Sequence, residues 1–152
     1  MFKIAVIAFA LVAAVSARTS PCSEGASAMP LAVRINTCPD NNAICRIIRG
    51  TAIEGQMDFV SPFGATALRP HITAHAIGTT VIYELPADRA IGCDWIMGTS
   101  CPLSEDEFAT YSLNMPITDQ YPLIPLIIEV RLFDQSDNLQ FCVSIESEVV
   151  AN

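Results

Sequence analysis

Residues 123–133 read Leu-Ile-Pro-Leu-Ile-Ile-Glu-Val-Arg-Leu-Phe, and residues 139–150 read Leu-Gln-Phe-Cys-Val-Ser-Ile-Glu-Ser-Glu-Val-Val. In the first stretch every second side chain is apolar, and the opposite face carries Glu129 and Arg131 beside Ile127. The second stretch alternates in the same way, with one face formed by Leu139, Phe141, Val143 and Ile145 and the other by Gln140, Cys142, Ser144 and Glu146. A period of two is typical of strands that bury one face.

Shorter runs of this kind cover the rest of the chain. Ten Pro and seven Gly are scattered along the 152 residues, which argues against a helical bundle. Further strands are predicted at residues 31–36, 44–48, 57–60, 68–77, 80–85 and 109–115. About eight strands with one apolar face each predict a single all-β domain of two antiparallel sheets packed face to face.

The N-terminus is expected to lie outside this domain. Lys3 is followed by an uninterrupted apolar run over residues 4–15, and residues 15–17 read Val-Ser-Ala, which suits a signal peptidase. Such a run is shorter than the roughly 20 residues of a membrane-spanning helix. The sequence predicts a secretory signal peptide over residues 1–17 and a mature domain over residues 18–152.

The charge of the mature domain limits its partners. Because Lys3 is the only lysine, the domain has seven Arg against sixteen acidic residues, a formal charge of −9. Binding to nucleic acid or to anionic membranes needs clustered cations, so we exclude nucleic acid and disfavour tight membrane binding.

All six cysteines lie in the mature domain, and an even number in an exported protein predicts three disulfides. Six cysteines can pair in 15 ways, so the count leaves the connectivity open. Two pairs lie close in sequence across polar, turn-rich stretches, and local pairing there would leave the first and last cysteines for each other. The six residues are Cys22, Cys38, Cys45, Cys93, Cys101 and Cys142.

No motif for catalysis or metal binding is present. Cys-x-x-Cys, Gly-x-Ser-x-Gly, His-Glu-x-x-His and a Gly-rich phosphate loop are all absent. His71 and His75 share a predicted strand face, but four residues along a strand span roughly 13 Å, too far for one catalytic centre. The acidic run at residues 105–107 lacks the EF-hand pattern and is interpreted as a solvated turn. We therefore predict a protein that is not an enzyme and has no metal or cofactor.

Several short motifs occur together in the second half of the chain. They are Cys101-Pro102-Leu103, Tyr111, Met115-Pro116-Ile117 and Tyr121-Pro122-Leu123-Ile124, followed by residues 128–132 and 138–142 and preceded by residues 78–86 and Cys93. In this combination, with the six-cysteine spacing, the chain resembles the ML family of lipid-recognition domains from about Cys22 to Val150. It is most similar to the Niemann-Pick type C2 branch, including arthropod secreted members.

The resemblance implies a fold, a disulfide pattern and a ligand. The family fold is an immunoglobulin-like β-sandwich with an apolar cavity between its two sheets, and its cysteines would pair here as Cys22–Cys142, Cys38–Cys45 and Cys93–Cys101. The family performs no covalent chemistry and binds one hydrophobic molecule, such as a sterol, a fatty acid or a lipid-like semiochemical. A membrane receptor or a lipid-transfer protein is the implied partner, and we expect a monomer.

The resemblance also assigns four lipid-binding residues. Tyr83 takes the place of an aromatic before the fourth cysteine, Ile117 follows the proline of a Leu-Pro-Val-like motif, and Tyr121 precedes the next proline. Their types suit a lipid portal, because amphipathic rings can cover an apolar ligand while their hydroxyls stay near water. Ordinary core or rim packing is the alternative for all three. Val130 aligns with a tryptophan of mammalian sterol carriers, so an inward Val130 would change the shape of the pocket.

The departures from the family favour simple secretion. The lysines that help lysosomal members to bind anionic membranes are absent, and Asn36-Thr37-Cys38 is the only glycosylation-like sequon. We predict an extracellular rather than a lysosomal protein. Three functions stay open: a lipid carrier, an innate-immune protein that recognises microbial lipid, and a structural secreted β-domain without a ligand.

Overall fold

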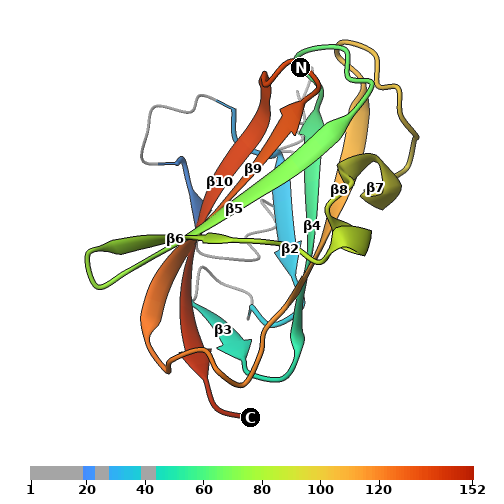
Figure 1. Cartoon of the computed structure of the whole chain (residues 1–152). Coiled ribbons are helices and arrows are strands. Elements are labelled where there is room, and N and C mark those ends of the chain that lie inside the picture. The colour runs from blue at the N-terminus through green and yellow to red at the C-terminus, as the bar shows by residue number, and fades with distance from the viewer. Residues whose placement is uncertain (1–18, 23–27, 39–43) are drawn as a thin grey trace, which may run out of the picture.

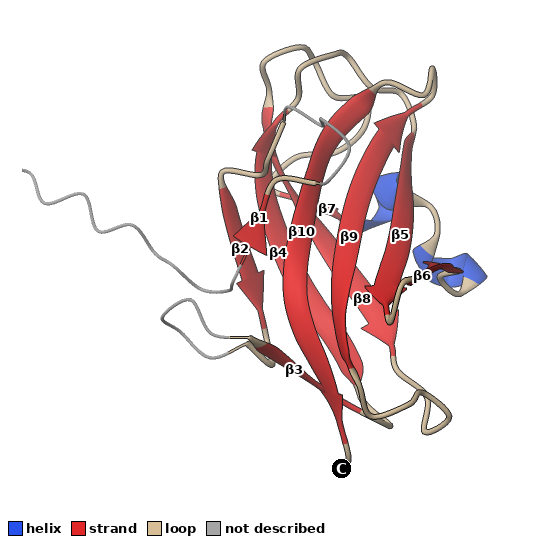
Figure 2. Cartoon of the chain, turned by 90° about the vertical axis from the view of Figure 1, so that its left-hand side faces the viewer, coloured by secondary structure: helices blue, strands red, loops and turns tan. Residues whose placement is uncertain are grey.

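The computed structural model describes residues 19–22, 28–38 and 44–152, and within them it forms two sheets packed face to face (Figure 1). A view turned by 90° shows one sheet behind the other (Figure 2). The predicted all-β sandwich is therefore confirmed. The predicted signal peptide, residues 1–17, lies outside the described residues and stays a prediction.

The first sheet, called sheet A here, has six strands. Across it lie β1 (Thr19–Ser20), β10 (Leu139–Val150), β9 (Pro125–Asp134), β5 (Leu68–Ala76) and β6 (Thr79–Tyr83), and β3 (Cys45–Ile48) pairs with the end of β10. The pairings are antiparallel, as predicted, except that β3 runs parallel to β10. Strand β6 stands at one end of this order, and among the described residues it pairs only with β5.

The second sheet, sheet B, has four strands. Their order is β2 (Ala32–Ile35), β4 (Ala52–Val60), β8 (Phe108–Pro116) and β7 (Ile96–Met97). The chain crosses from β6 to β7 through two short 3-10 helices, η1 (Ala87–Arg89) and η2 (Gly92–Trp95), at the side of the sandwich (Figure 1). In the described part of the chain, neither helix has the length or apolar character needed to cross a bilayer.

Three predicted strand details need correction. Strand β4 begins at Ala52 rather than at residue 57, because Gly55 takes a buried position and interrupts the apolar pattern. Strand β5 ends at Ala76, because Ile77 and Gly78 form a two-residue hairpin turn with φ of 52° and 69°. A β-bulge between Leu139 and Phe141 places Gln140 in the interior.

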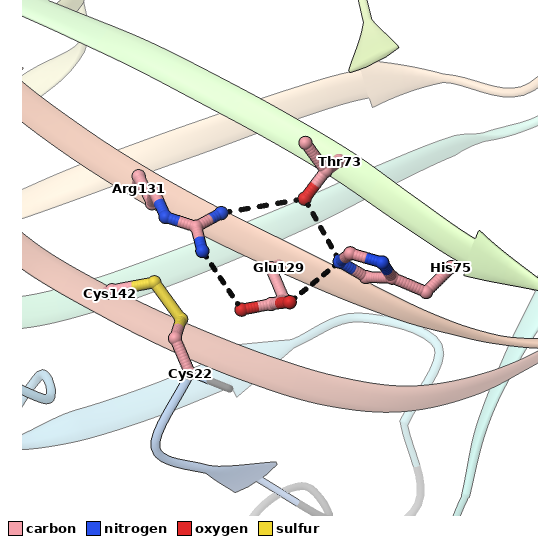
Figure 3. Close-up of a disulfide and its surroundings, with 6 residues drawn as sticks. All are labelled: Cys22, Thr73, His75, Glu129, Arg131 and Cys142. Atoms are coloured by element: carbon pink, nitrogen blue, oxygen red, sulfur yellow. Dashed lines mark hydrogen bonds and ion pairs between the residues drawn. A yellow bond between two sulfur atoms is a disulfide. The ribbon is translucent and has the colours of Figure 1, made fainter. Parts of the chain in front are cut away.

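All three disulfides follow the pairing that the resemblance implied, Cys22–Cys142, Cys38–Cys45 and Cys93–Cys101. The first lies on the outer face of sheet A beside Glu129 (Figure 3). Both sulfurs are bonded to each other, so this group offers no thiolate to a metal.

Glu129 is buried on that outer face at 2% exposure and has two basic partners there. Its carboxylate lies 2.6 Å from His75 Nε2 and 3.2 Å from Arg131 Nη2 (Figure 3). Burying a carboxylate without a partner is costly, so this cluster explains the charges on the polar face of β9. His71 lies edge-on to the Phe133 ring, and burial beside Arg131 lowers the pKa of its imidazole.

One end of the space between the sheets, here called the packed end, is filled by aromatic rings. The Phe141 ring lies 5.2 Å from the Phe59 ring and 6.3 Å from the Tyr111 ring, between centroids. These three side chains are buried to 2% exposure or less. Burial raises the pKa of the Tyr111 phenol, as expected for a hydroxyl far from water.

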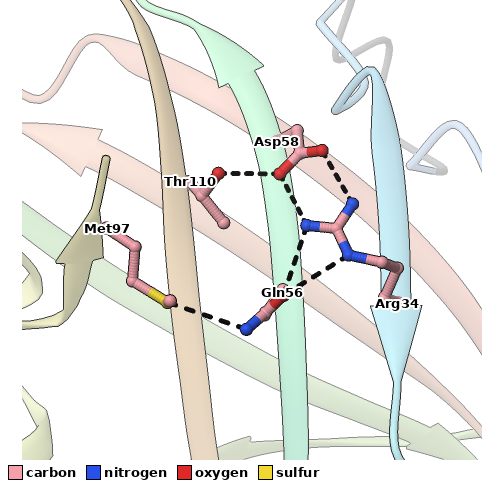
Figure 4. A network of polar contacts seen from close by, with 5 residues as sticks. All are labelled: Arg34, Gln56, Asp58, Met97 and Thr110. Atoms are coloured by element: carbon pink, nitrogen blue, oxygen red, sulfur yellow. Dashed lines mark hydrogen bonds and ion pairs between the residues drawn. The ribbon is translucent and has the colours of Figure 1, made fainter. Parts of the chain in front are cut away.

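On the outer face of sheet B, over this packed end, side-chain hydrogen bonds join neighbouring strands. Arg34 donates two hydrogen bonds to Asp58, of 2.7 Å and 2.8 Å, and Thr110 donates a third to the same carboxylate (Figure 4). These residues come from three neighbouring strands, β2, β4 and β8, so the network crosses most of the sheet. Hydrogen bonding from Arg34 lowers the pKa of Asp58.

Candidate functional site

A cavity of about 170 Å³ lies at the opposite end of the sandwich, here called the hollow end. Its walls expose almost only carbon atoms. Fourteen residues from both sheets and their connections line it: Ile47, Ala74, Ala76, Val81, Ile82, Tyr83, Met115, Ile117, Tyr121, Pro122, Ile124, Leu126, Ile128 and Val149. Such a space holds an apolar ligand better than it holds water, because it offers water almost no hydrogen bonds.

The size of the side chains on β5 explains why this end is hollow. Towards the packed end, the inward side chains of β5 are Leu68 and Ile72, which are buried in the core. Towards the hollow end, the inward positions carry Ala74 and Ala76. Because the strands keep their spacing, smaller side chains leave unfilled volume between the sheets.

Ile117, the residue that follows β8, lines the cavity. Its backbone N–H donates to Thr51 O at 2.8 Å, and its carbonyl accepts from Gly50 N at the same distance. Two backbone hydrogen bonds thus hold this residue against the turn between β3 and β4, and its side chain is 5% exposed.

Tyr121 reaches the cavity from the connection between β8 and β9. The Arg49 guanidinium donates to the backbone carbonyls of Asp119 and Tyr121, at 3.1 Å and 3.3 Å. At the far side of the connection, Val149 N donates to Ile124 O at 3.0 Å. The connection is therefore fastened at two points while it presents the Tyr121 ring and Pro122 to the cavity.

Tyr83 ends the edge strand β6 and crosses from one sheet to the other. Its hydroxyl donates a hydrogen bond of 2.5 Å to the backbone carbonyl of Pro116, the last residue of β8. Its ring stacks on Tyr121, with centroids 6.4 Å apart and planes at 29°. Burial raises the pKa of both phenols above the usual value near 10, so both hydroxyls stay protonated at neutral pH.

The structure brings together three of the four residues that the resemblance selected. Tyr83, Ile117 and Tyr121 all line the cavity. Val130 does face inward, but it is fully buried in the core opposite Val143 and Ile72 and does not line the cavity. Mid-strand neighbours fill the space around it in the ligand-free protein, and its lipid-binding role stays a prediction.

Sequence reasoning missed the aliphatic walls of the cavity. Ile47 and Val149 come from the paired strands β3 and β10, and Val81 and Ile82 come from β6. The alternation of β10 could have indicated Val149, but the parallel pairing that brings Ile47 beside it leaves no signature in the sequence.

The fold and the cavity define a class of protein: a small disulfide-bonded β-sandwich with an apolar hollow at one end. The family model for the ML domain matches residues 16–149, and the chain belongs to this family. Within it, the chain is of the Niemann-Pick type C2-like kind.

The comparisons with individual proteins agree with this assignment. The chain is 25% identical over 146 residues to the mouse NPC intracellular cholesterol transporter 2, with 96% of this chain and 95% of the relative aligned. It is 27% identical over 117 residues to homolog a of that transporter from Drosophila melanogaster, with 77% of each aligned.

Among solved structures, a Niemann-Pick type C2 protein from the Japanese carpenter ant has a TM-score of 0.72 at 20% identity, covering 83% of this chain and 96% of its own. Chicken MD-1, solved with lipid IVa, has a TM-score of 0.50 at 13% identity, covering 84% of this chain and 85% of its own. Both likenesses concern the fold.

Proposed function

We propose that this protein is a secreted, non-enzymatic carrier that binds one hydrophobic lipid between its two sheets and transfers it. The observation that carries the proposal is the cavity at the hollow end, which is lined by both sheets and exposes almost no polar atoms. The names of the relatives support it, since they include cholesterol transporters and a structure solved with a lipid.

The driving force of binding is the removal of apolar surface from water. Each Å² of apolar ligand surface that enters the cavity contributes on the order of 25 cal/mol. This force has little directionality, so a sterol and a fatty acid are both candidate ligands.

The size of the cavity restricts how a ligand sits. A volume of 170 Å³ is below the roughly 300–1,000 Å³ of pockets for drug-sized ligands. The ligand is therefore slim, such as an acyl chain, or the hollow end widens when a bulkier ligand binds.

The direct test is to purify the native protein, extract it with organic solvent and identify the extract by mass spectrometry. A sterol or fatty acid in stoichiometric amount supports a carrier. An acylated microbial glycolipid would instead favour immune recognition. An empty extract, together with no binding of added lipid, would favour a structural domain and overturn the proposal.

Variants test the location of the ligand. Tyr121→Ala removes a wall of the cavity and should weaken binding of a fluorescent fatty acid or sterol about tenfold or more, because a buried aromatic contact is lost. Ile117→Asp should abolish binding by placing a charge among apolar atoms. Both variants should lose more lipid affinity than stability of the fold. Thermal unfolding followed by circular dichroism would measure the stability.

The matched control is Phe108→Ala, which removes an exposed aromatic ring from the opposite end of β8. It should leave lipid affinity unchanged. Equal losses in Tyr121→Ala and Phe108→Ala would show that the cavity is not the binding site.

A further inference from the structure

We propose that the Tyr83 hydroxyl is a latch that controls how fast a ligand enters and leaves the cavity, an inference that rests on the proposed lipid-binding function. The latch is the hydrogen bond from Tyr83 to the Pro116 carbonyl, which joins the free edge of sheet A to the end of β8 in sheet B.

The position of β6 makes it the movable wall of the hollow end. It is five residues long, and in the described chain it pairs with β5 alone. Val81 and Ile82 are 57% and 62% exposed although both also line the cavity, so β6 separates the cavity from solvent with a single strand. A strand with so few buried contacts opens at a low free-energy cost compared with the core.

The other walls are held more firmly. Arg49 fastens the connection that carries Tyr121, and backbone hydrogen bonds fasten Ile117. By contrast, the Tyr83–Pro116 bond is the one hydrogen bond that joins β6 to sheet B among the residues that the structure describes. Widening of the hollow end is therefore expected to begin where Tyr83 separates from Pro116 and from the Tyr121 ring.

The chemistry of the bond suits repeated opening. Pro116 supplies a backbone carbonyl, which water can satisfy when the phenol leaves, and the phenol can equally donate to water. A neutral hydrogen bond of this kind has a small net strength in water, enough to change an opening rate several-fold and too little to prevent opening. Because the latch can close again over a bound ligand, it should affect the rates of association and dissociation alike.

The test is Tyr83→Phe, which keeps the ring and its stacking on Tyr121 but removes the hydroxyl. We expect association and dissociation of a fluorescent fatty acid, measured by stopped flow, to be about three to ten times faster in both directions. The two rate constants should rise by similar factors, because the protein loses the same hydrogen bond with and without its ligand. Tyr111→Phe is the matched control, since it loses a phenol hydroxyl in the packed end, and its rates should equal those of the wild type.

A second readout does not depend on any ligand. Amide hydrogen exchange of β6 in the ligand-free protein should be faster in Tyr83→Phe than in the wild type, with β9 and β10 unchanged.

The outcomes separate the latch from the function. Faster association and dissociation, with faster exchange in β6, support the latch. Unchanged rates and unchanged exchange overturn it while wild-type binding still supports the carrier. A change confined to dissociation would make the hydroxyl a ligand contact and also overturn the latch. If the wild type binds no probe, the proposed carrier function fails. In that case, faster amide exchange of β6 in Tyr83→Phe would still show that Tyr83 holds the two sheets together, and unchanged exchange would show that it does not.

Discussion

The packed end and the hollow end of the sandwich are built from the same strands, and they differ in what those strands put inside. At the packed end, Phe59, Tyr111 and Phe141 meet ring to ring. At the hollow end, the Tyr83 and Tyr121 rings stand at the cavity wall, and the remaining positions carry mainly aliphatic side chains and the two small residues Ala74 and Ala76. The packed end thus supplies stability, and the hollow end supplies volume for a ligand.

This difference shows how one core can both fold and bind. Filling every position would give the greatest stability and leave no room for a ligand. Fully buried rings fill the packed end, and the small side chains of β5 leave the unfilled volume at the other end, beside β6, the last strand of sheet A in the described chain. The three predictions below test whether the two ends really act separately.

The largest effect is expected from Phe141→Ala at the packed end. Removing this fully buried ring should lower the free energy of unfolding by about 3–5 kcal/mol, from lost burial and from the cavity left behind. Denaturant unfolding at fixed pH would measure this loss of stability. The free energy of lipid binding to the folded variant should change much less than the free energy of unfolding. A loss of only 1 kcal/mol would mean that the packed end is not the main source of stability.

A smaller effect, on lipid affinity rather than on stability, is expected from Ala74→Phe at the hollow end. The added ring should fill the cavity and weaken lipid binding about tenfold or more, while the free energy of unfolding changes by about 1 kcal/mol or less. Titration with a fluorescent lipid and denaturant unfolding would measure the two effects. Normal affinity in a folded Ala74→Phe protein would place the ligand elsewhere.

The smallest effect is expected in the hydrogen-bond network of Arg34, Asp58 and Thr110 on the outer face of sheet B. Because Arg34 lowers the pKa of Asp58, this carboxylate contributes stability above its ordinary pKa of about 3.9, and the contribution is lost as the pH falls through the lowered value. Asp58→Asn should therefore be less stable than the wild type at pH 7, by less than about 1 kcal/mol because Arg34 is half exposed. The gap should close below about pH 4, measured by thermal unfolding across pH, and a constant gap would contradict this account.

Much of the fold could be predicted from the alternation in single strands. Strands β9 and β10 were recognisable because Val130 and Val143 belong to regular apolar faces, which the observed pairing places side by side. The disulfide pairing needed the resemblance, because the cysteine count alone allowed many patterns. Strand β4 was predicted too short, because Gly55 occupies a core position that an apolar residue would have revealed.

The candidate site could be predicted only in part. Tyr83, Ile117 and Tyr121 stand beside recognisable motifs, whereas the space they surround depends on which residues are small, such as Ala74. The resemblance selected Val130, and alternation shows only that its side chain faces inward, not how far along the sandwich it lies from the cavity. The hydrogen bond from Tyr83 to Pro116 joins residues that are 33 positions apart, and no local pattern predicts it.

The three disulfides include no residue of β6 and no residue of the cavity wall. Covalent crosslinking therefore stabilises the rest of the sandwich without restraining the walls of the cavity. Crosslinking and ligand-sized volume thus belong to separate parts of the chain, so each can change in evolution or in the laboratory while the other is preserved.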